Sequence, residues 1–589
     1  MEVVIMRSII QPSKKLYFFA LMLAAAYIYG ILSTQHYLPS VLDLYISLGV
    51  TLILGIGLLV YVSTIKIKYS NSIAVLCLFF ASLILLQPII NNIDYSDSLI
   101  FPVISLLFMG LISIVLVNIE EKSIIIYAIL ASVYIGGILT VCTQLLQLEF
   151  LSYPSWLSNL TFHGTDNTRP YGNVGQPNQA AYIITMSMLA SGYWLLKLKH
   201  NNAIYNYLLI IIFFISILFL GIGQGLSSSR GGLILSIIAC LGISSLFDMT
   251  LRKRSLFLAV LLAVLSMGNW LGVKLLGKYA NFQFTAIDRV IATDASRPLR
   301  WYLQEQAWSI FSSNWLTGAG WGNFPKMALP QAESLNWFVF ATNSHFLPSQ
   351  IAAELGILGV FGLVALLLIV LRSIFSAKCN LENKAIITLL IISLLYACSE
   401  YPFWYIRFLF LFTCLLSLID TRKILVNFNL KPFFITFLFT LLLGSGYYLN
   451  NYRMYVAVDS LIKRPEVDSH EAEVLVAQLP NIYGFNKFKE VMLFQVVSVN
   501  EKNIKYSIEL GNRVVNNYLD PDLMVKQAML LALNNDQEDS LRLFKAACLY
   551  DFSKNCKLIE KKLSLLSITQ PLVFKDINES FKTWRLNIK

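Results

Sequence analysis

Residues Leu99–Val117 read LIFPVISLLFMGLISIVLV, nineteen consecutive positions without a charged side chain. As an α-helix this run would be about 28 Å long, which matches the roughly 30 Å hydrocarbon core of a bilayer. The rest of the chain has the same character, because 57% of its 589 residues are hydrophobic and only 13% are charged. Soluble domains keep about a quarter of their residues charged. The sequence therefore predicts an all-α polytopic membrane protein.

Apolar runs of this kind recur along the chain, and we predict about thirteen transmembrane helices. The predicted spans are Leu16–Ser33, Val41–Ser63, Ser72–Ile90, Leu99–Val117, Ser123–Leu146, Gln179–Leu196, Ala203–Gly221, Gly232–Phe247, Ser255–Leu276, Leu347–Leu371, Ala385–Ser399, Phe403–Ile419 and Pro432–Leu449.

Lysine and arginine gather in alternate loops between these runs, and cytoplasmic loops are the ones that accumulate positive charge. The clusters are Arg7 with Lys14 and Lys15, Lys66 with Lys68, Lys122, Lys197 with Lys199, Arg252 to Arg254, Arg372 with Lys378 and Lys384, and Arg422 with Lys423. Arg169 and Arg230 break the pattern. The pattern predicts a cytoplasmic amino terminus and, with an odd number of spans, an outer carboxyl-terminal segment. It also explains the net charge of +11 without nucleic-acid binding.

Charge density divides the chain into two predicted domains. Residues 1–450 form the transmembrane body, which includes a large outer loop at 277–345. Residues 451–589 carry 19 Lys or Arg and 17 Asp or Glu, a soluble composition. We expect short amphipathic helices there, compatible with helical repeats over Ile504–Leu566.

Cysteine and histidine usage gives no metal-ligand spacing, so we predict neither a metal site nor a cofactor. Most of the eight cysteines fall in apolar runs, where they suit packing. Cys548 and Cys556 lie in the segment placed outside. An oxidising compartment would permit a disulfide between them, and the alternative is two free thiols.

Three outer segments contain candidate functional residues. The first, residues 149–178, includes Arg169, Gln176 and Asn178 among glycines that permit close approach of backbone to a ligand. A plain connecting loop is the alternative. The second is the short turn around Arg230, whose guanidinium suits phosphate because its donors match two oxygens at once. Its alternative is snorkelling to lipid head groups.

The third segment is the loop before Leu347, with Arg289, Arg297 and Arg300. Pro298–Phe311 shows helical spacing of apolar residues and predicts an amphipathic surface helix. His345 closes the loop. Histidine has a reference pKa near 6.5 and suits general-base catalysis, although a lone histidine is more often structural. Glu354 follows nine residues later, which places the two side chains on roughly opposite helix faces.

At these residues the sequence resembles the bacterial O-antigen ligase and polymerase superfamily, and within it the protein O-oligosaccharyltransferases that glycosylate pilins. The superfamily marker is a histidine eleven residues before Gly-x-x-Gly, as in His345 and Gly356–Gly359. Phe346 departs from the small polar residue of many relatives. Other matching pieces are Arg169–Asn178, Ser229–Gly231, Arg300–Trp308, Gly318–Phe324 and Glu400–Tyr405.

The resemblance implies a GT-C-like fold in the bacterial inner membrane, with a periplasmic carboxyl-terminal domain. It implies en bloc transfer of an oligosaccharide from undecaprenyl pyrophosphate to a Ser or Thr hydroxyl of a periplasmic protein, possible acceptors including a pilin. We predict His345 as the general base, with Arg230 and Arg300 stabilising the leaving pyrophosphate. The predicted substrate-binding residues are Arg169, Gln176, Asn178, Arg297, Trp321, Glu354 and Glu400.

Two alternatives stay open at this point. The nearer is another enzyme of the superfamily, a ligase or polymerase acting on a sugar acceptor. The farther is a transporter or flippase, a class that typically shows broken helices at mid-membrane in repeated halves. The sequence has no clear internal repeat, and its charges collect in outer loops. The soluble carboxyl-terminal segment favours the oligosaccharyltransferases.

Overall fold

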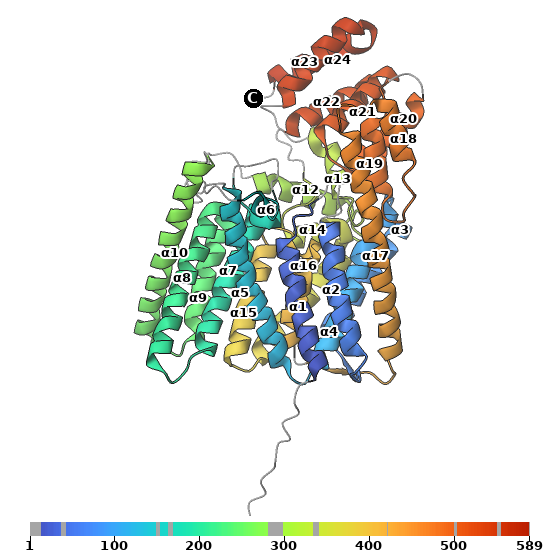
Figure 1. Ribbon diagram of the computed structural model, residues 1–589. Helices are drawn as coiled ribbons and strands as arrows, with labels where there is room; N and C mark the ends of the chain where they lie inside the picture. The colour runs from blue at the N-terminus through green and yellow to red at the C-terminus, as the bar shows by residue number, and fades with distance from the viewer. Residues whose placement is uncertain are drawn as a thin grey trace, which may run out of the picture.

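The computed structural model describes residues 13–36, 43–148, 154–162, 169–280, 299–333, 341–420, 422–499, 503–550 and 555–587. Helices dominate this part of the chain (Figure 1). Its β-structure is one antiparallel pair of two-residue strands, β1 (Tyr69–Ser70) and β2 (Ile424–Leu425). The predicted all-α class is confirmed.

Each of the thirteen apolar runs contains a helix within its described residues. Their helices are α1 (Lys14–Leu32), α2 (Leu44–Val62), α3 (Ser72–Ile90), α4 (Ile100–Val117), α5 (Lys122–Gln147), α7 (Pro177–Lys197), α8 (Ala203–Ser227), α9 (Arg230–Leu246), α10 (Leu251–Tyr279), α14 (Leu347–Ser376), α15 (Leu381–Ala397), α16 (Ile406–Ile419) and α17 (Lys431–Ile462). Within the described residues, nine helical segments are long and apolar enough to cross a membrane, and α9 and α16 are shorter apolar helices. The chain is a multi-pass membrane protein, and the count of thirteen spans stays a prediction.

Small residues bring neighbouring helices into close contact in this bundle, as is common where lipid removes the hydrophobic driving force. The clearest case is the pair α8 and α10, which lies at one side of the bundle (Figure 1). A Cβ on Gly225 would lie 2.2 Å from the carbonyl oxygen of Asn269, and one on Gly272 would lie 2.1 Å from that of Ile222. Glycine is therefore required at this helix crossing.

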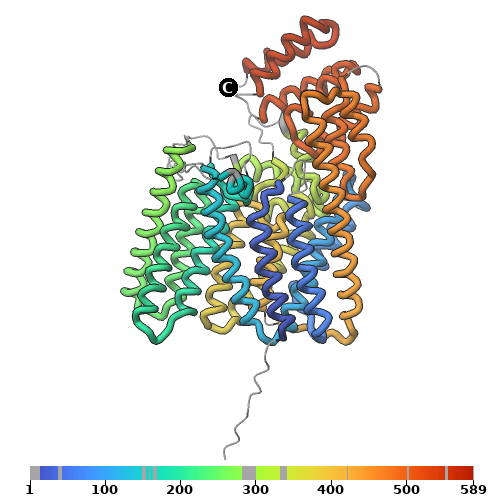
Figure 2. The backbone as a smooth tube through the Cα atoms, viewed as in Figure 1, coloured from blue at the N-terminus to red at the C-terminus, as the bar shows by residue number. Residues whose placement is uncertain are grey.

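The last of the bundle helices continues into the carboxyl-terminal region, so the predicted domain boundary at residue 450 falls inside α17. Figure 2 shows the chain rising from the bundle through this helix. The helices that follow are α18 (Ser469–Ala477), α19 (Asn486–Val496), α20 (Ile504–Asn517), α21 (Pro521–Leu533), α22 (Gln537–Tyr550), α23 (Asn555–Thr569) and α24 (Pro571–Asn587). The carboxyl-terminal region lies at the end of the bundle opposite the start of α1 (Figure 1).

The large loop between α10 and α14 covers that same end of the bundle with α12 (Leu299–Ser313) and α13 (Phe324–Ala328). The predicted amphipathic helix is confirmed in α12. Its Leu303 and Ile310 are buried, whereas Trp308 is exposed. Ile310 belongs to one continuous apolar core with the helices of the carboxyl-terminal region. The loop therefore packs against both α14 of the bundle and the carboxyl-terminal helices.

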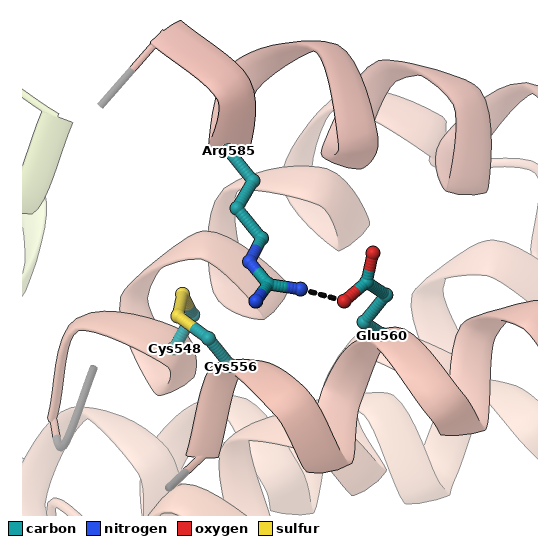
Figure 3. The surroundings of a disulfide bond; sticks show 4 residues. All are labelled: Cys548, Cys556, Glu560 and Arg585. Carbon is teal, nitrogen blue, oxygen red and sulfur yellow. Dashed lines mark ion pairs between the residues drawn. A yellow bond between two sulfur atoms is a disulfide. The ribbon is translucent and has the colours of Figure 1, made fainter. Parts of the chain in front are cut away.

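The alternatives for Cys548 and Cys556 are resolved, since the two residues form a disulfide that joins α22 to α23 (Figure 3). An ion pair between Glu560 and Arg585 then connects α23 to α24.

Candidate functional site

His345 stands directly before α14 in a strained backbone conformation. Its φ of 53° lies in the left-handed region, which non-glycine residues seldom adopt. Three hydrogen bonds hold the segment. The His345 N–H donates to Asn343 Oδ1 at 3.1 Å, and the Ser344 N–H donates to Gln350 Oε1 at 2.7 Å. Gln304 Nε2, from α12, donates to the Ser344 carbonyl at 2.8 Å. Strain held in this way is typical of functional sites.

The imidazole ring of His345 is oriented by Glu400, which follows α15. Nδ1 lies 2.8 Å from Glu400 Oε2, and the Glu400 side chain is only 4% exposed. Burial raises the pKa of the Glu400 carboxyl, but the His345 hydrogen bond and the Arg300 charge outweigh it, so this pKa lies below its ordinary value. An ionised carboxylate can only accept, so Nδ1 carries the proton. Nε2 is then the basic nitrogen, as general-base catalysis requires.

The other oxygen of Glu400 joins two more predicted site residues. Oε1 accepts a hydrogen bond from Arg300, on α12, at 2.7 Å. It also accepts one from Asn178 Nδ2, in the first turn of α7, at 2.8 Å. The Arg300 guanidinium is about half exposed, at 51%. One carboxylate therefore binds a candidate base and a candidate phosphate ligand that lie 45 residues apart in the sequence.

Asn178 extends this network to the start of α9. Its Oδ1 accepts a hydrogen bond from the Ser229 hydroxyl at 2.8 Å. Ser229 is the N-cap of α9 and accepts from the Gly232 N–H at 3.1 Å. Arg230, the first residue of α9, is exposed and directly follows this cap. Hydrogen bonds thus link the start of α9 to Glu400 through Asn178.

Two further predicted site residues, Arg169 and Gln176, lie in the segment that precedes Asn178. Arg169 is half-buried at the start of the Arg169–Asn178 segment, and Gln176 is the N-cap residue of α7. Gln176 has a buried Oε1 that accepts no hydrogen bond from any residue that the structure describes. Arg297 lies outside the described residues, as does Arg289.

Glu354 supports the loop from inside α14. It is 2% exposed, and its Oε1 accepts a hydrogen bond from the Gly322 N–H at 3.0 Å. The α14 helix is broken beside it at Gly356, where φ is 63° and ψ is −155°. The Ala319 N–H reaches the Ala353 carbonyl at 2.9 Å through this break. The Glu354 carboxylate therefore binds the loop turn through Oε1 in this structure.

Trp321, from that loop turn, stacks on Trp404 with ring centroids 5.2 Å apart and planes 8° from parallel. The pair lines one part of a cavity of about 480 Å³ among α2, α3, α4, α14, α16 and α17. The cavity wall is mainly apolar and includes Leu347 and Ile351, in the first turns of α14 after His345. An apolar cavity therefore adjoins the polar network.

Within the described residues, no group of three or more His, Cys, Asp or Glu side chains is placed to hold a metal ion.

Comparison with known proteins adds to this geometry. Residues 214–364 match the family model described as O-antigen ligase. The sequence resemblance to the O-antigen ligase and oligosaccharyltransferase superfamily is confirmed. The chain is also 24% identical, over 425 residues, to the ComP-specific O-oligosaccharyltransferase of Acinetobacter baylyi, a match that covers 69% of this chain and 72% of that protein. These two matches support the conclusion that the chain is a membrane enzyme that transfers glycans.

The superfamily match includes His345, Arg300 and Arg230, but it ends before Glu400 and begins after Asn178. The tertiary structure brings these two outlying residues to the matched segment, through the hydrogen bonds of Glu400.

Sequence reasoning missed Arg407, which it counted inside the apolar run Phe403–Ile419. Its side chain is 1% exposed and pairs with Asp43 at 2.9 Å. A single arginine in an otherwise uncharged span is itself a signal, because buried charge in a membrane protein is costly and generally functional.

Proposed function

We propose that this protein is an O-oligosaccharyltransferase. It transfers a preassembled glycan in one step from undecaprenyl pyrophosphate to a Ser or Thr hydroxyl of a periplasmic protein. The observation that carries the proposal is the bridging of His345 and Arg300 by Glu400. This arrangement places a base with a fixed tautomer beside a guanidinium that suits pyrophosphate. The superfamily match over residues 214–364 supports glycan transfer as the reaction.

In the proposed reaction the acceptor hydroxyl oxygen attacks the anomeric carbon of the donor sugar. The bond between that carbon and the pyrophosphate oxygen breaks, and undecaprenyl pyrophosphate leaves with the bonding electrons. His345 Nε2 takes the hydroxyl proton, while Glu400 stabilises the imidazolium that forms. Arg300 and Arg230 stabilise the charge that grows on the leaving group. This step balances without a metal or a redox partner.

The apolar cavity is the proposed seat for the part of the polyprenyl tail nearest the pyrophosphate. Leu347 and Ile351 line it within two helical turns of His345. Trp321 and Trp404 would contact the tail where it enters, and Arg169, Gln176 and Asn178 would contact sugar or phosphate oxygens. The proposed orientation is a cytoplasmic amino terminus with the carboxyl-terminal domain in the periplasm of a bacterial inner membrane. The large loop and that domain would then share the acceptor side.

The first test compares His345→Ala with the unaltered chain in cells that make a lipid-linked glycan. Intact masses of periplasmic proteins and pilins are measured together with lipopolysaccharide mobility. The expected result is a protein mass shift equal to the glycan, lost in the variant at unchanged expression. His200→Ala is the matched control, because His200 lies in the loop between α7 and α8 at the opposite end of the bundle. It should keep full transfer.

Other outcomes of this experiment would redirect the assignment. A change in lipopolysaccharide alone would favour the ligase or polymerase reaction, which the O-antigen ligase description of the family also fits. Transfer retained by His345→Ala would remove His345 as the base. No change in any product would reopen the transporter hypothesis.

A further inference from the structure

Arg407 is a buried cation that binds four residues from separate parts of the fold. Besides Asp43, it donates to the Gly30 carbonyl at 3.2 Å and to the Val174 carbonyl at 3.3 Å. It also donates to Gln179 Oε1 at 2.7 Å. A buried charge costs several kcal/mol unless it is paired and hydrogen-bonded. The ion pair with Asp43 and these hydrogen bonds compensate the charge and fix the position of the guanidinium.

His36 completes the cluster from the loop after α1. Its Nδ1 lies 2.8 Å from Asp43 Oδ1, and its Nε2 lies 2.7 Å from the Asn173 carbonyl. Both ring nitrogens therefore face oxygen atoms, and these contacts hold the ring between Asp43 and the Asn173 turn. The charged groups that face it are Asp43 and, through that carboxylate, Arg407. The ring also packs on the turn, 3.1 Å from the position of a Cβ on Gly175.

The backbone of Asp43 lies in the left-handed region, with φ at 55°. Its short polar side chain tolerates this conformation, as that of asparagine does.

Two routes lead from this cluster to the Glu400–His345 pair. In the first, Arg407 and His36 hold η2 (Gly172–Val174), and four residues further on Asn178 donates to Glu400. In the second, the Arg407 guanidinium lies over the Tyr405 ring at 4.9 Å. Tyr405 stacks on Tyr401 with centroids 5.9 Å apart, and Tyr401 meets the His345 ring edge to face at 5.2 Å.

We propose that His36, Asp43 and Arg407 are positioning residues for the transfer reaction. They fix the Asn173–Asn178 turn and the tyrosine stack, and thereby the orientation of Glu400 and His345. This inference rests on the proposed function. The three residues bind neither substrate nor leaving group, so their loss lowers turnover and leaves the affinity for the donor unchanged.

The test uses the full chain in nanodiscs, with undecaprenyl pyrophosphate-linked oligosaccharide as donor and an acceptor that shows a mass shift in cells. Asp43→Asn and Arg407→Met should lower kcat up to about a hundred-fold, because misplacement by about 1 Å costs that much. The KM for the donor should stay near its wild-type value. Glu382→Gln, which removes an ion pair with Lys197 at the opposite end of the bundle, is the matched control and should retain turnover.

The double variant D43N/R407M separates positioning from folding. Each single change removes one charge of the Asp43–Arg407 pair and leaves the other without its counter-charge, whereas the double change removes both charges of the pair. Thermal stability should therefore recover in the double variant, while kcat stays low because Val174 and Gln179 have lost their donor. Wild-type kcat in the double variant would show that the cluster only supports folding and would overturn the proposal.

His36→Gln tests the proposal in the case in which the charge variants do not fold. It removes at least one of the two ring contacts, because an amide cannot place nitrogen atoms at both imidazole positions. A lowered kcat at unchanged donor KM supports the proposal, and unchanged kcat refutes it. A different result would refute the proposed function, namely that the wild-type chain transfers glycan to no protein. If the wild type transfers and all the cluster variants match it, only the positioning role is lost.

Discussion

Glu400→Gln is the change that tests the proposed mechanism most directly. The Glu400 carboxylate accepts from His345 Nδ1 at 2.8 Å, from Arg300 at 2.7 Å and from Asn178 at 2.8 Å. An amide of the same shape has one acceptor oxygen and one NH₂ group. Either the histidine or the pair formed by Arg300 and Asn178 must then face a donor.

The size of the effect follows from these contacts. A hydrogen bond to a charged group contributes about 1.5–3 kcal/mol, and each 1.4 kcal/mol is worth about tenfold in rate. Losing the charge opposite the forming imidazolium therefore costs roughly 10- to 150-fold. If the amide NH₂ faces Nδ1, the ring proton moves to Nε2 and the base is lost, a change that costs about 10⁴-fold in serine proteases. We expect kcat for Glu400→Gln to fall between about 10- and 10⁴-fold.

The assay is single-turnover transfer by the full chain in nanodiscs, with folded protein quantified by thermal unfolding. The direction of the pH dependence also follows from the pKa of Glu400. Because the folded-state pKa of Glu400 is depressed, its stabilising contribution is present above the unfolded value of about 4.3 and is lost as pH falls through the lower folded value. Glu400 therefore does not titrate between pH 5 and 8, and the loss of kcat in Glu400→Gln should keep the same size across this range. A folded variant with kcat within a few-fold of wild type would refute the His345–Glu400 pairing as part of the mechanism.

Four further residues or bonds give measurable expectations. Gly318→Ala should lower the thermal midpoint and impair transfer, because its Cβ would lie 2.2 Å from a backbone oxygen of α14; Gly322→Ala, also at positive φ but with nothing within 4 Å, should lose less. Burial lowers the pKa of Lys487 to about 8, so between about pH 8 and 10.4 the unfolded chain binds more protons than the folded chain. Folding stability should therefore rise with pH in this range. Thermal unfolding of Lys487→Met should show a smaller rise. Replacing Cys548 and Cys556 by serine should destabilise the carboxyl-terminal helices by roughly 2–3 kcal/mol, since the disulfide closes a loop with a sequence separation of 8; denaturant unfolding with and without reductant measures this.

Individual residues show how far the sequence predicts the site. His345, Arg300 and Glu400 were each predicted from local motifs, yet no motif indicates that one carboxylate binds both of the others. Glu354 has a similar apolar context in the sequence, and the structure places its carboxylate on the Gly322 N–H. The difference between the two glutamates lies in which distant segment packs beside each, which spacing along one helix does not encode.

The all-α membrane class, the positions of the helices and most polar residues at one end of the bundle could be predicted from the sequence alone. These follow from local physics, because a bilayer requires apolar runs of a set length and favours helices that satisfy their own backbone. The Asp43–Arg407 pair and the convergence of Asn178, His345 and Glu400 became visible only in the folded chain. Those contacts depend on how helices far apart in the chain pack around polar groups that must find partners once buried.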